Sequence, residues 1–133
     1  MYYPDLSRYE YSTDPDGEPQ AVFNVGWLGR GHAFPTGPTP PGLLEALFLF
    51  ARQPVNVTRG WQRCAFCAPS APYPIQVTRD GITLRLGSAE LRAAGPDGAA
   101  YAAPDLVYHY VEAHSYRPPI PFIEAVRSST GAT

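Results

Sequence analysis

Two pairs of potential metal ligands lie far apart in this sequence. One is a C-x2-C pair, Cys64 and Cys67, and the other is an H-x4-H pair, His109 and His114. Two thiolates and two imidazoles at these local spacings are the ligand set that tetrahedral structural zinc favours. We therefore predict that the two pairs form one zinc site. The alternative is a buried thiol pair and two hydrogen-bonded core histidines.

A catalytic metal is a second interpretation of the same residues. It requires an open coordination position and a base nearby. The H-E-x-x-H motif is absent, and one extra residue between Glu112 and His114 breaks the inverted H-x-x-E-H motif. The zinc deaminase pattern is absent as well. Glu90 is the one carboxylate that we expect near the site, so a small metal-dependent hydrolase remains the alternative to a non-enzymatic domain.

Four further residues are candidates for ligand contact. Arg59, Trp61 and Arg63 precede the first cysteine and could form an anion-binding or stacking face, although arginine stems covering a tryptophan ring are the commoner arrangement. His32 lies in a loop rich in Gly and Pro, where it could face a ligand or only solvent. Redox chemistry by the cysteines is disfavoured, because the pair lies between prolines and a hairpin rather than at the start of a helix.

Length and composition limit the classes of protein that the chain can represent. It has 133 residues, 44% of them hydrophobic, which is enough to fold without relying on a metal. The net charge of −2 argues against a nucleic-acid binder. A zinc-finger-like domain that binds nucleic acid is therefore ranked last, as the second alternative. A signal peptide and a membrane-spanning run are not evident, which predicts a cytoplasmic protein. In a reducing compartment a close thiol pair favours metal over a disulfide.

The elements that must position these residues indicate an α+β fold. Two alternating runs flank Asp80-Gly81, which predicts a hairpin with a type I′ turn. Strands are predicted over 21–28, 55–58, 75–79, 82–86, 88–93 and 99–102, the last four as an antiparallel meander, and helices over 40–53, 103–114 and 119–127. We predict a single domain over 1–133, with an extended arm at 1–19 and a frayed tail at 128–133.

The second predicted helix carries both histidines. At 100° per residue, both turn towards its apolar face, separated by about 140°. Joint binding of one metal therefore requires the last helical turn to loosen, which Pro118 and Pro119 downstream make plausible. The order of cysteine pair, hairpin and helix predicts a zinc-finger-like, treble-clef-like C-terminal half.

Five segments of the chain carry a family resemblance, namely 24–28, 32–37, 58–67, 87–90 and 101–119. Together they resemble a small uncharacterised bacterial family that keeps the C-x2-C and H-x4-H pairs together. The resemblance covers nearly the whole chain and is consistent with one shared site, but it implies no particular activity. By analogy with small stand-alone domains it implies a regulatory, immunity-type or accessory role, with an unknown protein or small molecule as partner.

Overall fold

The chain forms an α+β structure that positions the four potential ligands at one end of a small sheet. A computed structural model describes residues 2–9, 21–58, 60–95 and 98–129. Its elements are, in chain order, β1 (Val22–Asn24), α1 (Leu43–Ala51), β2 (Ile75–Arg79), β3 (Ile82–Leu86), β4 (Glu90–Ala94), β5 (Ala100–Pro104), α2 (Val107–His114) and α3 (Ile120–Ser129).

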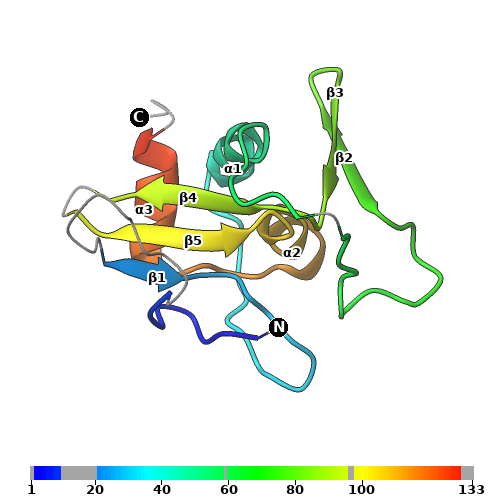
Figure 1. The fold of residues 1–133 in the computed structure, drawn as a ribbon, viewed down its shortest axis with the longest axis horizontal. Helices are drawn as coiled ribbons and strands as arrows, with labels where there is room; N and C mark the ends of the chain where they lie inside the picture. The colour runs from blue at the N-terminus through cyan, green and yellow to red at the C-terminus, as the bar shows by residue number, and fades with distance from the viewer. Residues whose placement is uncertain (1, 10–20, 59, 96–97, 130–133) are drawn as a thin grey trace.

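The strands form two separate sheets instead of one continuous meander. In the first sheet β5 is central, antiparallel to β4 and parallel to β1. The second is the β2–β3 hairpin, which projects away from the first sheet at the end where α2 lies (Figure 1). The predicted type I′ turn is confirmed, because Asp80 and Gly81 have φ values of 50° and 79°.

Several elements differ from their predicted bounds. β1 covers Val22–Asn24 instead of 21–28, and α1 covers Leu43–Ala51 instead of 40–53. Two further differences have local reasons. Ala103 and Pro104 belong to β5, where they pair with β4, so α2 begins only at Val107. Proline is compatible here because its fixed φ also suits the end of an extended segment. The predicted strand at 55–58 is reduced to a single bridge between Val55 and Glu90.

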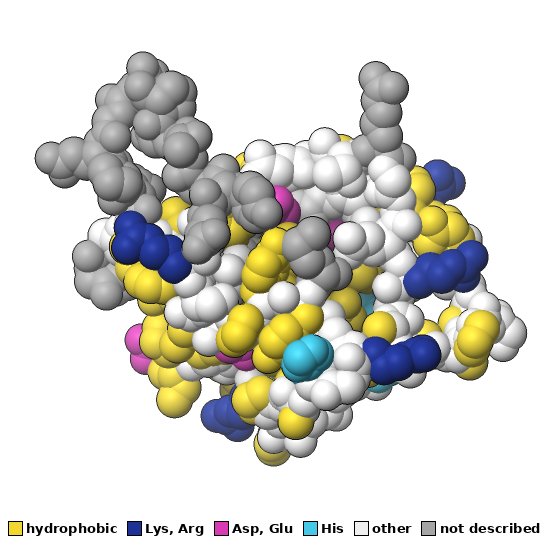
Figure 2. Space-filling model, turned by 60° about the horizontal axis from the view of Figure 1, so that its bottom comes forward, with side chains coloured by type: hydrophobic (Ala, Val, Ile, Leu, Met, Phe, Trp, Pro, Cys, Tyr) yellow, Lys and Arg dark blue, Asp and Glu magenta, His cyan; other side chains and the backbone are white. Residues whose placement is uncertain are grey.

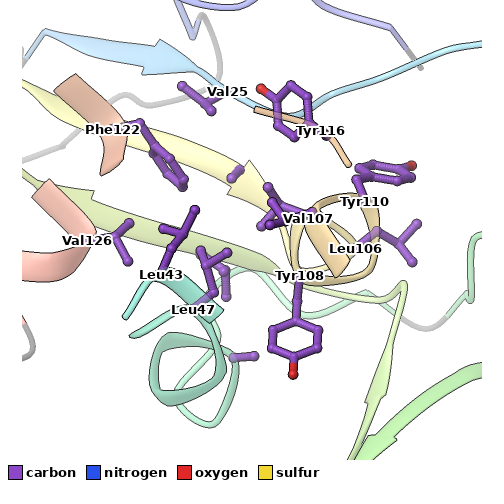
Figure 3. Close-up of a cluster of buried hydrophobic side chains, with 14 of the residues drawn as sticks. Val25, Leu43, Leu47, Leu106, Val107, Tyr108, Tyr110, Tyr116, Phe122 and Val126 are labelled. Atoms are coloured by element: carbon purple, nitrogen blue, oxygen red, sulfur yellow. The ribbon is translucent and has the colours of Figure 1, made fainter. Parts of the chain in front are cut away.

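The main core lies between the first sheet and its helices. Helices α1 and α3 pack against each other and against β4, and α1 also contacts α2. Their buried side chains converge on the same volume (Figure 3), which is lined by Leu43 and Leu47 of α1, Val107 of α2, and Phe122 and Val126 of α3. Each of these side chains contributes about 1.5–3 kcal/mol by burial, so this part of the core has a stability of its own.

The N-terminal segment lies along the outer edge of β1. The Leu6 N–H donates to the Asn24 carbonyl at 2.7 Å, and the Tyr9 N–H donates to the Val22 carbonyl at 2.8 Å. Residues 2–9 of the predicted arm are therefore bound to the sheet edge, and residues 10–20 lie outside the described part. Of the predicted frayed tail, 128–129 belong to α3, and 130–133 lie outside the described residues.

Candidate metal centre

The four predicted ligands come together in space. Cys64 and Cys67, which we call the knuckle with the two residues between them, lie in the long connection from α1 to β2. His109 and His114 come from the first and the last turn of α2. One ligand atom from each residue lies within 4.8 Å of every other, so the group could hold a metal ion.

Three sulfur–nitrogen distances in this group are close to the edges of a coordination tetrahedron. The Cys67 Sγ lies 3.2 Å from the His109 Nε2 and 3.5 Å from the His114 Nε2, and the Cys64 Sγ lies 3.3 Å from the same His114 atom. Zinc–sulfur bonds near 2.3 Å and zinc–nitrogen bonds near 2.05 Å separate the two ligand types by about 3.5 Å in a tetrahedron. Each of the two imidazoles approaches the sulfur atoms with its Nε2 atom.

The end of α2 brings the second histidine into position. His114 is the last helical residue, and Ser115 takes a left-handed conformation with φ 56°. The Ser115 and Tyr116 N–H groups both donate to the Tyr110 carbonyl, which closes the helix. The helix therefore continues through His114 and ends abruptly after it, and the expected loosening of its last turn is not seen. The negative end of the helix dipole at this point favours a bound cation.

Burial favours the uncharged forms of two of the ligands, Cys64 and His109. Burial raises the pKa of the Cys64 thiol, although a bond from the Phe66 N–H lowers it in part. Burial, with a smaller contribution from His114, lowers the pKa of His109 and favours the neutral imidazole. A divalent cation would stabilise the thiolates and bind the neutral imidazoles directly. A raised thiol pKa is the opposite of what a redox cysteine requires.

Phe66, between the two cysteines, packs the knuckle onto α2. Its ring centroid lies 5.6 Å from that of His114, 5.9 Å from that of Tyr110 and 5.1 Å from that of Phe34. Phe66 was not among the candidate site residues of the sequence. The sequence signal that could have identified it is an aromatic residue between the two cysteines. A large apolar ring at this position is expected to pack against the rest of the protein.

The other predicted binding residues lie outside the four-ligand group. His32 is exposed and stacks on Tyr2, with 3.7 Å between ring centroids. Trp61 and Arg63 lie just before the knuckle, and Arg59 lies outside the described residues. The expectation that Glu90 lies near the site is wrong, because its carboxylate accepts the Tyr9 hydroxyl and, among the described residues, does not join the cluster.

Comparison with known proteins identifies the family and gives no activity. The model of a domain of unknown function, DUF7919, matches residues 1–127. The chain belongs to the DUF7919 family. No curated protein and no solved structure matches it significantly. In the part of this DUF7919 chain that the structure describes, no helix has the length and apolar character needed to cross a bilayer.

Asp105 connects the start of α2 to the segment that leads into the knuckle. Its carboxylate accepts the Gly87 N–H at 2.8 Å, and its own N–H donates to the Ala89 carbonyl at 3.0 Å. The Gly87 carbonyl in turn accepts the Gln62 N–H at 2.8 Å, two residues before Cys64. These bonds hold the β3–β4 connection between the two halves of the site. Asp105 was not among the candidate site residues of the sequence.

The stability supplied by Asp105 should decrease as the pH rises. Burial raises the pKa of Asp105 from 3.8 to about 6, against the lowering effect of backbone donors led by Gly87. Between these values the folded chain binds more protons than the unfolded chain, so the unfolding free energy falls with increasing pH. At about 1.4 kcal/mol per pKa unit, the loss from pH 4 to pH 7 is at most about 3 kcal/mol.

Urea unfolding at several pH values, with chelator present throughout, measures this loss. The unfolding free energy of the wild type relative to Asp105→Asn should decline from pH 4 to pH 7. Glu124→Gln, at an exposed position on α3, is the control and should follow the wild type. Identical pH profiles for the wild type and Asp105→Asn would contradict a raised pKa of Asp105 in the folded protein.

Proposed function

We propose that this DUF7919 protein is a non-enzymatic, zinc-stabilised domain that binds a partner. The observation that supports the proposal is the set of sulfur–nitrogen distances of 3.2–3.5 Å among four side chains from two separate segments. All four corners of a tetrahedral ion would be protein ligands. A site closed in this way is typical of structural zinc.

Zinc is the metal that this donor set favours. Two thiolates with two imidazoles in tetrahedral arrangement are typical of zinc, whereas magnesium and calcium prefer oxygen ligands. We further propose that the zinc fixes the knuckle against α2, in a treble-clef-like relation with β4 and β5 inserted between the hairpin and the helix. A cytoplasmic location with reduced thiols agrees with this proposal.

A metal-dependent hydrolase is the second candidate, and one observation favours it. A cavity of about 220 Å³ is lined by both cysteines. Hydrolysis by a bound metal needs a free coordination position for water and a base within hydrogen-bonding reach. Four protein ligands leave no such position, and neither Glu90 nor His32 joins the cluster among the described residues. The cavity therefore supports ligand binding better than catalysis.

A nucleic-acid partner has less support. Arginine side chains on the face in Figure 2 are separated by hydrophobic and uncharged surface, so they do not form one continuous basic surface. The net charge of −2 also opposes phosphate-backbone binding. We therefore propose a protein or a small molecule as the partner.

Metal analysis with cobalt substitution tests the metal and its geometry together. Protein purified without a metal-affinity column should contain about one zinc per chain by mass spectrometry. Replacement by Co²⁺ should give the intense visible absorption of a tetrahedral ion and sulfur-to-cobalt charge transfer. These spectra should not change with added azide, because a closed site has no position for it. Metal-free protein, or a spectrum that azide shifts, would contradict the proposal.

A further inference from the structure

Two adjoining cavities lie beside the knuckle, and Arg30, Arg63 and Ala65 line both of them. The larger has a volume of about 220 Å³ and is otherwise walled by the knuckle, Tyr73 and small apolar side chains. The smaller, about 190 Å³, reaches Trp27 and Tyr110. We call the two cavities together the arginine cleft. Both arginines of the cleft therefore line its larger and its smaller cavity.

Both arginines are held in place by contacts that leave donors available. Arg63 lies over the Tyr73 ring, with its guanidinium carbon 3.9 Å from the centroid, and the Tyr73 hydroxyl donates to the Trp61 carbonyl at 2.9 Å. Contact through the face of a guanidinium leaves its in-plane N–H groups free to bind oxygen. Arg30 donates one N–H to the Ala65 carbonyl at 3.2 Å. An arginine carries five such donors.

The positive charge of the cleft is not neutralised within the described residues. Neither cavity has an Asp or Glu side chain in its wall. The ion pairs found among the described residues belong to Arg79 and Arg92. A zinc ion with two thiolates and two neutral imidazoles has no formal net charge, so the metal site would not offset the arginines.

We infer that the arginine cleft binds the phosphate or carboxylate group of a small organic anion. Each cavity is smaller than the roughly 300 Å³ at which pockets for drug-sized ligands begin, which suits an anionic group with a short organic body. Guanidinium groups match the oxygen geometry of such anions, and two residues that line both cavities, Arg30 and Arg63, carry them. The organic body would lie against Tyr73 and the apolar wall. The inference rests on the proposed function, because the metal fixes the knuckle that lines the larger cavity.

Calorimetric titration of the purified full chain with phenyl phosphate tests the inference. Benzoate provides the carboxylate, and benzyl alcohol provides the same ring without charge. We expect saturable binding of at least one anion and none of the alcohol. Arg30→Gln and Arg63→Gln should each weaken it about tenfold or more, the effect of losing a charged hydrogen bond. Arg85→Gln, exposed and outside both cavities, is the matched control and should bind like the wild type.

The outcomes separate this inference from the proposed function. Phenyl phosphate binding tighter than benzoate would identify a phosphate ligand, and the reverse a carboxylate ligand. Zinc-loaded protein that binds neither anion, binds the alcohol equally, or loses no affinity in the arginine variants would overturn the inference alone. Protein without metal would overturn the proposed function. Its titration with the anions and the alcohol would still test the cleft by the same criteria. Zinc content measured in each variant shows whether the knuckle is intact.

Discussion

Replacing Cys64 by serine and His114 by alanine together is expected to abolish metal binding and to release the knuckle from α2. The two side chains supply a thiolate and an imidazole whose ligand atoms lie 3.3 Å apart. Only two of the four ligands remain in the variant. Structural zinc contributes on the order of 10 kcal/mol of apparent binding free energy near pH 7 in small zinc domains, so most of the order in the knuckle should be lost with it.

The loss should be local, because apart from the ring contacts of Phe66 and the bond from Arg30 to the Ala65 carbonyl few described bonds hold the knuckle. Among the described residues from Cys64 to Pro74, the backbone–backbone hydrogen bond outside helices and strands is a turn in which the Ala71 N–H donates to the Ala68 carbonyl. The core between α1, α3 and β4 has its own buried side chains and should persist. Hydrogen exchange should therefore become fast over 61–74 and the end of α2, while α1 and α3 stay protected.

Two comparisons make this result decisive. His32→Ala removes the one histidine of the chain that is not a predicted ligand. This side chain is exposed and outside the cluster, so the variant should keep its full zinc content and its full protection from exchange. Chelator-treated wild type should show the same exchange pattern as the double variant. Full zinc content or unchanged protection over 61–74 in the double variant would refute the four-ligand site.

The local parts of the fold could be predicted because their signals lie within a few residues. The Asp80-Gly81 turn is an example, since two consecutive positive φ values are tolerated at Asp-Gly and the flanking alternation fixes the register. The metal cluster could be predicted for a different reason. Cysteine and histidine pairs have few alternative uses, so the two local spacings indicated a shared site although 42 residues separate Cys67 from His109.

Contacts that depend on how distant segments meet could not be predicted. The parallel pairing of β1 with β5 joins residues about 80 positions apart in the chain, and nothing in the Val22–Asn24 sequence specifies its partner. Arg30 has the same difficulty, because the Gly29-Arg30-Gly31 segment carries no spacing relation to the knuckle that it contacts. Glu90 was misplaced for the related reason that β4 leaves the hairpin and joins the other sheet.

Replacing Gly87 by alanine is expected to destabilise the protein strongly and to weaken metal binding. Gly87 has φ 117°, a conformation that side chains with a Cβ rarely adopt. A Cβ at this position would lie 2.7 Å from the Gln62 carbonyl oxygen, which is backbone and cannot turn aside. Strain and overlap together should cost roughly 2–6 kcal/mol of unfolding free energy.

The effect on the metal follows from what the overlap displaces. The Gln62 N–H donates to the Gly87 carbonyl at 2.8 Å, and Gln62 leads into the knuckle two residues later. Moving this segment shifts the thiolate of Cys64 relative to the histidines on α2, and a tetrahedral site tolerates only small changes in its distances. Zinc affinity, measured by competition with a chromogenic chelator, should therefore fall together with the unfolding free energy measured in urea.

Gly42→Ala separates backbone strain from steric overlap. Gly42 also has a positive φ, 78°, but a Cβ there would meet no atom within 4 Å. Its substitution should cost about 1–2 kcal/mol, the penalty of a left-handed residue alone, and should leave zinc affinity unchanged. If Gly87→Ala is no less stable than Gly42→Ala and binds zinc as the wild type does, then Gly87 does not hold the approach to the knuckle. A larger loss at Gly87, accompanied by weaker zinc binding, would show that the β3–β4 connection positions the cysteine half of the site.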